Sequence, residues 1–571
     1  MFRHALILGL LGVLAAPPAA AQWTSRLSVS AQGGQFTKES GGSDITPDGR
    51  FVVLLSRDPL ATGGPGSKLQ VVLLDRSTHD FELISATPQG APSNDDAVRG
   101  FCSADGRYVV FGSLATDLVP GVPGSVQHLY RRDRLTGTTE LLANHPDGSP
   151  STTVLTLDSI SDDGHRIVFS SHDNELVPGD SDFLDVFLQD MLAGTITRLA
   201  HGLQGAEPDN VSYRGSISAD GTRVAFSSWA KNLVDETIGT PFHSDVYSID
   251  LAGGAITLLS KSSAGAQGDG NSTHPKISAD GSVVAFESDA TNLVLGDTNE
   301  VADVYVRELA TGTTQRISLT LDGEQPNADM TPVAVSADGR FVLFDGEADT
   351  LVPGDDNNSS DAFLVDRASG AMTLVTETLD GHVGSWGAVS RGMTGDGTAV
   401  LFTSLSTGFV PIDSNLVSDA FLRILSGCDA PVVTYCTPSL TSIPGCQAWM
   451  SHQGVPSVAA PRGFLLKAGP IPGGASIGVA YATVNGPAAF PIGTLGGTIC
   501  AAAFQRVGPA LSGGTPGQCD GELGFDLSDL VSSMPGQIQV GITVHFGVWF
   551  RDLANPDTFA LSNAIWFQIC P

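Results

Sequence analysis

A short signal recurs seven times along this chain: a small or polar residue, then Asp-Gly, then a brief apolar run. Successive Asp residues of the signal are separated by 57, 58, 57, 60, 58 and 58 residues, at Asp48, Asp105, Asp163, Asp220, Asp280, Asp338 and Asp396. Such a steady period is typical of one supersecondary unit stacked on copies of itself. It constrains the fold strongly, and it says little about a ligand.

One copy, residues 276–318, shows what the unit is. Asp280-Gly281 predicts a type I′ or related tight turn, because Gly tolerates positive φ. The alternating or apolar runs at residues 283–288, 303–308 and 314–318 read as strands. With the segment before the turn they make four short strands in meander order, which is the unit of a β-propeller blade.

The two ends of the repeat array complement each other. The last copy stops after its third strand, residues 419–423, while residues 24–30 match the fourth-strand pattern of residues 315–320. An N-terminal strand that completes the last blade closes the ring and removes an exposed sheet edge. The predicted fold is therefore all-β, a seven-bladed β-propeller over residues 22–427 closed by an N-terminal velcro strand.

The repeats also carry a family resemblance. Ser-Ala-Asp-Gly-Arg, an aliphatic-aromatic strand, Asp-Val-Tyr or Asp-Val-Phe and a Gly turn resemble the WD40-like repeat of TolB-type periplasmic propellers. The longer variant, with Val-Pro-Gly-Asp ahead of the third strand, resembles repeats of large secreted bacterial proteins. The resemblance covers about residues 23–427 and implies a propeller of an exported protein.

Leader and charge point to an exported, acidic protein. Residues 1–21 have a positive start, an apolar run and small residues before Gln22, which predicts a signal peptide cleaved after Ala21. No other segment is long and apolar enough to span a bilayer. With 29 basic and 61 acidic residues the net charge is −32, which disfavours nucleic-acid partners. The charge is explained by solubility in a saline or extracellular setting, and attraction of cations or basic partners is the alternative. We expect a monomer in the periplasm, at the cell surface or in the medium.

Composition changes at about residue 428. Six of the seven cysteines lie beyond it, at Cys428, Cys436, Cys446, Cys500, Cys519 and Cys570, and an even number in an exported domain predicts three disulfides of open connectivity. Residues 428–571 therefore read as a Cys-rich, disulfide-stapled, β-sandwich-like domain that resembles C-terminal modules of Planctomycete-like secreted proteins; surface attachment, secretion sorting and a plain structural cap stay open as its role. Cys102 occupies a repeat position that aliphatic residues and Met393 fill elsewhere, so we expect a buried hydrophobe.

Acidic residues recur in the loop before the third strand of four copies. The candidate calcium ligands are Asp180, Asp182, Asp185, Asp297, Asn299, Asp303, Asp355, Asn357, Asp361, Asp413, Asn415 and Asp419. Oxygen ligands clustered on a short loop suit Ca²⁺. The alternative is turn capping, in which the Asp that opens each third strand accepts hydrogen bonds from backbone N–H groups.

Three functions remain open from the sequence. Because like residues repeat in like environments, we expect a non-catalytic platform that binds a protein or cell-envelope component. A structural surface protein anchored through its C-terminal module is one alternative, and a propeller hydrolase or lyase acting on polysaccharide or peptide is another. Gly-Ala-Ser476-Ile-Gly matches a hydrolase elbow, but it sits in a β-rich stretch where that motif does not function. A polar residue that occurs once, facing the central channel, would favour the enzyme.

Overall fold

The computed structural model describes residues 23–425, apart from 31–33, 125, 181, 236–242, 321, 353–354, 356 and 411–412, and, beyond residue 425, only the backbone of strands. The predicted signal peptide and the side chains of the six C-terminal cysteines lie outside the described residues. The predicted disulfides therefore stay predictions.

The repeat array forms seven four-stranded antiparallel sheets, which confirms the seven-bladed propeller. Blades one to three consist of β2 (Ser40–Ile45), β3 (Phe51–Ser56), β4 (Gln70–Asp75) and β5 (Asp80–Leu83); β6 (Ala97–Cys102), β7 (Tyr108–Ser113), β8 (His128–Asp133) and β9 (Thr138–Leu141); and β10 (Leu155–Ile160), β11 (Arg166–Ser171), β12 (Asp185–Asp190) and β13 (Thr195–Arg198). Blades four to six consist of β14 (Ser212–Ile217), β15 (Arg223–Ser228), β16 (Asp245–Asp250) and β17 (Ile256–Leu258); β18 (Ser272–Ile277), β19 (Val283–Ser288), β20 (Asp303–Glu308) and β21 (Thr314–Arg316); and β22 (Met330–Val335), β23 (Phe341–Gly346), β24 (Asp361–Asp366) and β25 (Ala371–Leu374).

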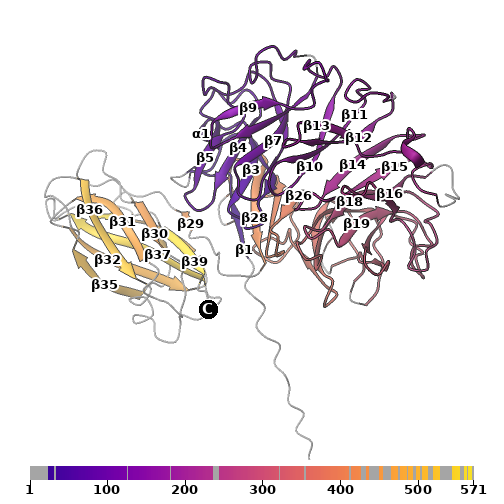
Figure 1. The fold of residues 1–571 in the computed structure, drawn as a ribbon. Helices are drawn as coiled ribbons and strands as arrows, with labels where there is room; N and C mark the ends of the chain where they lie inside the picture. Colours follow the sequence, from indigo (N-terminus) through magenta and orange to yellow (C-terminus); the bar gives the residue numbers. More distant parts are fainter. Residues whose placement is uncertain are drawn as a thin grey trace, which may run out of the picture.

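Blade seven joins the two ends of the array. It holds β26 (Ala388–Met393), β27 (Ala399–Ser404), β28 (Asp419–Ile424) and, as its outermost strand, β1 (Trp23–Arg26). β1 runs antiparallel to β28, with Trp23 opposite Ile424, and the two lie side by side in Figure 1 although their colours are at opposite ends of the array. The predicted velcro closure is confirmed.

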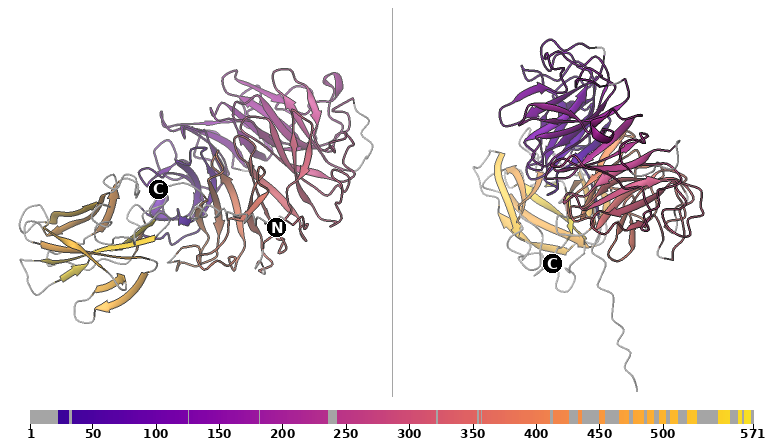
Figure 2. Two further views of the ribbon diagram at one scale, coloured as in Figure 1. Left: turned by 90° about the horizontal axis from the view of Figure 1, so that it is seen from below. Right: turned by 45° about the vertical axis from the view of Figure 1, so that its right-hand side comes forward.

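The first strands of the blades form the inner wall of the ring. Each of β2, β6, β10, β14, β18, β22 and β26 contacts the first strand of the next blade, and β26 contacts β2. Figure 2 shows the blades from two further directions, coloured along the chain. The ring is therefore closed on its inner side as well as through β1.

The Asp-Gly turns differ in type from the prediction. A type I′ turn needs positive φ at both central residues, but only the Gly has it, with φ between 68° and 73° in all seven copies. Each Gly N–H donates to the carbonyl three residues earlier, and the Asp carboxylate accepts from the hydroxyl two residues before it and the N–H two residues after it, as at Asp105. A type I turn followed by a left-handed Gly fits these contacts, and the Asp closes it from both sides.

These turns also link the blades to one another. Six inter-blade backbone hydrogen bonds of 2.7–3.1 Å run from Ala104 to Asp162, on through the equivalent turn of each following blade, and end with the Gly395 N–H on the Pro47 carbonyl. The seventh bond, from an N–H at position 47 to the Ala104 carbonyl, cannot form because residue 47 is a proline and has no N–H. The turn of blade one therefore accepts a hydrogen bond from blade seven but donates none to blade two.

The core lies between blades. Seven clusters of buried apolar side chains each join two neighbouring blades, including one shared by blades seven and one. In blades two to seven an aromatic pair of the second and third strands stacks with centroids 5.3–5.9 Å apart, as Phe169 does with Phe187. Cys102 is a buried free cysteine, as expected, with its thiol directed at Asp44.

Helix is almost absent from the described part of the chain, which holds α1 (Pro59–Thr62) and one 3₁₀ turn, η1 (Leu203–Gly205). No helix there is long and apolar enough to cross a membrane. Beyond residue 425 the strands pair into further sheets, the largest with the order β29-β39-β37-β32-β35, formed by Val433–Tyr435, Ala564–Gln568, Thr543–Asp552, Ser476–Val484 and Gln505–Leu511. Ser476 thus begins a strand paired on both edges, not the strand-to-helix turn that a hydrolase elbow requires.

Candidate functional site

The inner strands break the symmetry of the repeat. Arg99 lies on β6, Arg214 on β14, Lys276 on β18 and Arg391 on β26; we call these four residues the axial cations. The three arginines are exposed to solvent although their strands form the inner wall of the ring. Water therefore reaches the axis, and the axial cations are presented to it.

Among the described residues the three axial arginines, Arg99, Arg214 and Arg391, make no hydrogen bond and no ion pair. Every other arginine of the described residues makes a hydrogen bond or an ion pair. Arg99 and Arg214 instead lie over the rings of Phe101 and Tyr213, at 4.7 and 6.0 Å from the centroids. Guanidinium groups held by aromatic faces with free N–H groups are suited to bind carboxylate or phosphate.

The axial cations also act on one another. The protein around the axis removes part of the water near Arg99 and so lowers its pKa, although the side chain keeps contact with solvent; the charges of Arg391 and Arg214 add to this effect, and those of Asp158 and Asp44 oppose it. Burial, followed by the charge of Arg99, lowers the pKa of Lys276 to about 8. An anion placed among these groups relieves their repulsion and returns their pKa values toward the ordinary range.

Three carboxylates near the axis accept hydrogen bonds from groups other than the axial cations. Asp44 accepts from the Cys102 N–H at 2.9 Å, Asp158 from the Ser170 hydroxyl at 2.5 Å, and Asp345 from the Ser390 N–H at 2.8 Å. Burial raises the pKa of Asp44 and of Asp158 to about 6 and that of Asp345 to about 7. Near neutral pH part of their negative charge is therefore removed, and the axis becomes more cationic.

A fourth acidic group, Glu287 on β19, faces His274 of β18 at 2.9 Å and accepts from the Thr331 hydroxyl. Burial raises its pKa, but the hydrogen bond and charge of His274 bring it below the ordinary value. His274 and Arg214 have positive φ, 52° and 61°, where their strands bulge. Strain at non-glycine residues persists where the surrounding structure enforces it, and it is concentrated at functional sites.

In two blades the sequence-predicted calcium loops are built around protein cations. Arg316 Nη1 lies 3.0 Å from both Asp297 and Asp303 in blade five. In blade seven Arg26 lies 3.4 Å from Asp413 and 4.0 Å from Asp419. A guanidinium therefore occupies the space between each pair of carboxylates.

In blade six the position equivalent to these arginines is Leu374, and Asp355 and Asp361 are both buried. The amides of Asn299, Asn357 and Asn415 donate to the Asp that opens the third strand. Capping by backbone N–H groups is wrong for Asp303, Asp361 and Asp419, whose donors are side chains. Calcium binding itself stays a prediction.

Sequence reasoning missed the axial cations. The available signal was a departure from the repeat: Arg99 and Arg214 align with Gly42 and Leu157 of other inner strands. Periodicity describes what the copies share, whereas this site consists of what they do not.

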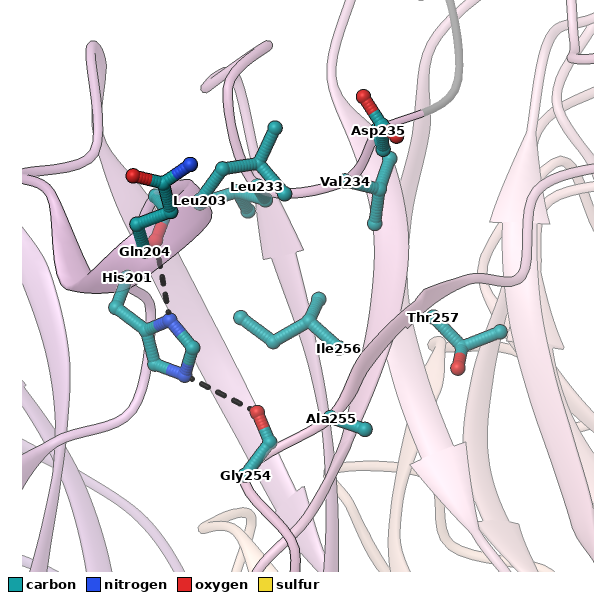
Figure 3. Close-up of a pocket in the computed structure, with 11 residues that line it drawn as sticks. His201, Leu203, Gln204, Leu233, Val234, Asp235, Gly254, Ala255, Ile256 and Thr257 are labelled. Carbon is teal, nitrogen blue, oxygen red and sulfur yellow. Dashed lines mark hydrogen bonds between the residues drawn. The ribbon is translucent and has the colours of Figure 1, made fainter.

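A pocket of ≈ 420 Å³ opens between blades three and four. Figure 3 shows His201 with one ring nitrogen toward the Gly202 carbonyl and the other toward the Gly254 carbonyl, 3.2 Å away, while Leu203 and Ile256 supply apolar wall. Asp235 is the one acidic side chain among the lining residues. The lining offers no nucleophile with an adjacent base, so the axis is the stronger candidate.

No family model matches this sequence, and no curated protein does. Solved propeller-containing structures do. A putative TolB from Agrobacterium tumefaciens is 17% identical with a TM-score of 0.31, over 62% of this chain and 96% of that one. The β-propeller domain of the trilobed protease from Pyrococcus furiosus is 11% identical with a TM-score of 0.40, over 70% and 100%. A prolyl endopeptidase is 13% identical with a TM-score of 0.42, over 79% and 57%. These likenesses accompany the fold and carry no functional argument.

Proposed function

We propose that this protein is an exported, non-catalytic binding platform that recognises an anionic group, carboxylate or phosphate, of a protein or cell-envelope ligand at the axis of the propeller. The observation that carries the proposal is the set of three arginines on inner strands that make no hydrogen bond or ion pair with any described residue. A charge-assisted hydrogen bond contributes about 1.5–3 kcal/mol. Guanidinium groups already held in place lose little side-chain entropy when such a bond forms.

The rest of the surface supports an axial site. The net charge of −32 repels polyanions in general, so an anionic group is admitted only where cations are concentrated. The axial cations lie on four different blades. A ligand that contacts all four cations therefore binds four blades at once, and it needs no contact with the repeated loops.

An axial hydrolase or lyase is the second candidate. It is favoured by Asp158, an acidic group with a raised pKa, near Lys276, an amine with a lowered one, and by the raised pKa of Asp345 beside Arg391. Groups whose environments move their pKa values toward neutrality are suited to general acid–base chemistry. Robust turnover of a polysaccharide or peptide that Asp158→Asn abolishes would establish this alternative over the platform.

The platform is tested by replacing the three axial arginines together with glutamine in the mature protein. Binding is measured by calorimetry with citrate and with inorganic phosphate, and by retention of envelope and medium fractions from the source organism. We expect the affinity to fall at least about tenfold, since each lost charge-assisted bond is worth a factor of about ten or more. Loss of phosphate but not citrate binding, or the reverse, identifies the anionic group.

A matched control removes the same charge from the outer surface. Arg50, Arg107 and Arg340 each pair with one Asp at 2.7–2.8 Å, and replacing all three with glutamine lowers the net charge equally. We expect binding within about twofold of the parent, because exposed pairs contribute little. Equal losses in both triple variants would refute an axial site and leave only a general charge effect.

A further inference from the structure

In blades four to seven the third strand begins with an Asp whose carboxylate accepts a hydrogen bond from a Ser or Thr hydroxyl. Asp245, Asp303 and Asp361 each accept a hydroxyl hydrogen bond from a residue 15 positions later, and Asp419 accepts one across the ring closure; the donors are Ser260, Ser318, Thr376 and Ser28. In blade three that position is Ala200. Asp185, the equivalent carboxylate, therefore lacks the donor that its counterparts have.

A second position has changed in the same blade. Gln35, Gln267 and Gln325 occupy one equivalent position in other blades, where Gln267 donates to Asp245 at 2.8 Å, Gln35 donates to Asp413 at 2.7 Å and Gln325 accepts from Arg316 at 2.8 Å. Blade three has Glu207 at this position, and a carboxylate cannot donate. Blade three has thus lost two donors and gained one negative charge.

The result is a group of buried oxygens without partners. Asp185 is 0% exposed, and neither of its carboxylate oxygens has a hydrogen-bond partner, nor does Oε2 of Glu207. Asp180, Asp185 and Glu207 each place one oxygen within 4.8 Å of the others. Oxygens that share one Ca²⁺ at about 2.3–2.6 Å lie at most about 5 Å apart.

Charge counting points the same way. Arg198 bonds Asp180 at 2.7 Å and Glu207 at 2.5 Å, so three carboxylates and one guanidinium give −3 + 1 = −2. In blade five, Asp297, Asp303 and Arg316 give −2 + 1 = −1, and a neutral amide and a hydroxyl complete the set. Blade three therefore carries one more negative charge than blade five, and one divalent cation would neutralise its total of −2.

We propose that Asp180, Asp185 and Glu207 bind one calcium ion, which blades five and seven do not need because their arginine and neutral donors satisfy the same position. Calcium suits the site better than magnesium, since it accepts irregular oxygen geometry and carboxylates in either binding mode. The competing occupant is a proton on Asp185, whose pKa burial and the neighbouring Asp180 raise. The ion site is independent of the axial site.

The test uses the mature protein stripped with chelator, with CaCl₂ as the only probe, in calorimetry and thermal unfolding. We expect one binding event, and a rise in Tm of about 3–5 °C when calcium exceeds Kd a hundredfold. The key variant is Ala200→Ser with Glu207→Gln, which gives blade three the hydroxyl and the neutral amide that blades four and five have at these two positions. It should show no heat with calcium and a higher Tm in chelator than the parent.

A reciprocal variant should gain a calcium site, so its result cannot be explained by a loss of folding. Ser318→Ala with Gln325→Glu gives blade five the composition of blade three, and its calcium stoichiometry should rise from one to two. Parent protein that gives neither heat nor a Tm shift would assign the site to a proton and overturn the proposal. Undiminished calcium binding by the Ala200→Ser, Glu207→Gln variant would also overturn it.

Discussion

Closure of the ring through its N-terminal segment gives the sharpest stability prediction. Leu27, directly after β1, is 6% exposed and packs in the cluster shared by blades seven and one, with Leu401 and Leu422. Truncation of a buried leucine to alanine costs about 2–5 kcal/mol, from lost apolar burial and the cavity that remains. We therefore expect Leu27→Ala to lower the free energy of unfolding by about that amount.

Ser28 separates the polar part of the closure from the apolar part. Its hydroxyl donates to Asp419, which is 0% exposed, so Ser28→Ala removes a donor from a buried carboxylate at a cost of about 1–3 kcal/mol. Val29 is only half-buried and lies in an isolated bridge with Gln35. We expect Val29→Ala to cost less than either of the other changes.

The assay is urea unfolding followed by tryptophan fluorescence and far-UV circular dichroism, with equal slopes required before midpoints are compared. The control is Leu192→Ala in a turn of blade three, where the side chain is 76% exposed and the change should stay within about 0.5 kcal/mol. If Leu27→Ala unfolds at the same urea concentration as Leu192→Ala, the N-terminal segment does not hold the ring, and the closure argument fails.

Three further predictions concern a turn, a carboxylate near the axis and a carboxylate of an exposed ion pair. Gly339→Ala should cost clearly more than Gly254→Ala, since both have positive φ but an added Cβ lies 2.5 Å from Val283 at the first and meets nothing within 4 Å at the second; equal melting temperatures would contradict this. Because burial raises the folded-state pKa of Asp345 to about 7, its contribution to stability is present below pH 4 and lost as pH rises through 7. Asp345→Asn should therefore exceed the parent in stability at pH 8 and match it at low pH. Asp366→Asn should behave oppositely, losing stability at pH 7 but not at low pH, because its hydrogen bond with Arg340 lowers the pKa of Asp366.

Some details were predictable because they depend on contacts close in sequence. The left-handed Gly of each Asp-Gly turn follows from local sterics, and the apolar environment of Cys102 follows from what its counterparts share. The turn type was wrong, since Asp-Gly is compatible with both types and the hydroxyl two residues earlier selects the one observed. The prediction of backbone donors to Asp303 was also wrong, because the side chains of Arg316 and Ser318 donate to it from the next strand and the loop after it.

The sequence by itself determined the number of blades, the place of the missing fourth strand and therefore the closed ring, because a repeated pattern needs only its period and its ends to be counted. It did not determine the axial cations or the partnerless Asp185. Arg99, Arg214 and Arg391 are separated by more than a hundred residues along the chain, and ring closure alone brings them to one axis. The orphaned carboxylate of blade three likewise becomes visible only when strand pairing places Ala200 and Glu207 beside it, since burial and hydrogen bonding belong to the assembled blade and not to any residue within it.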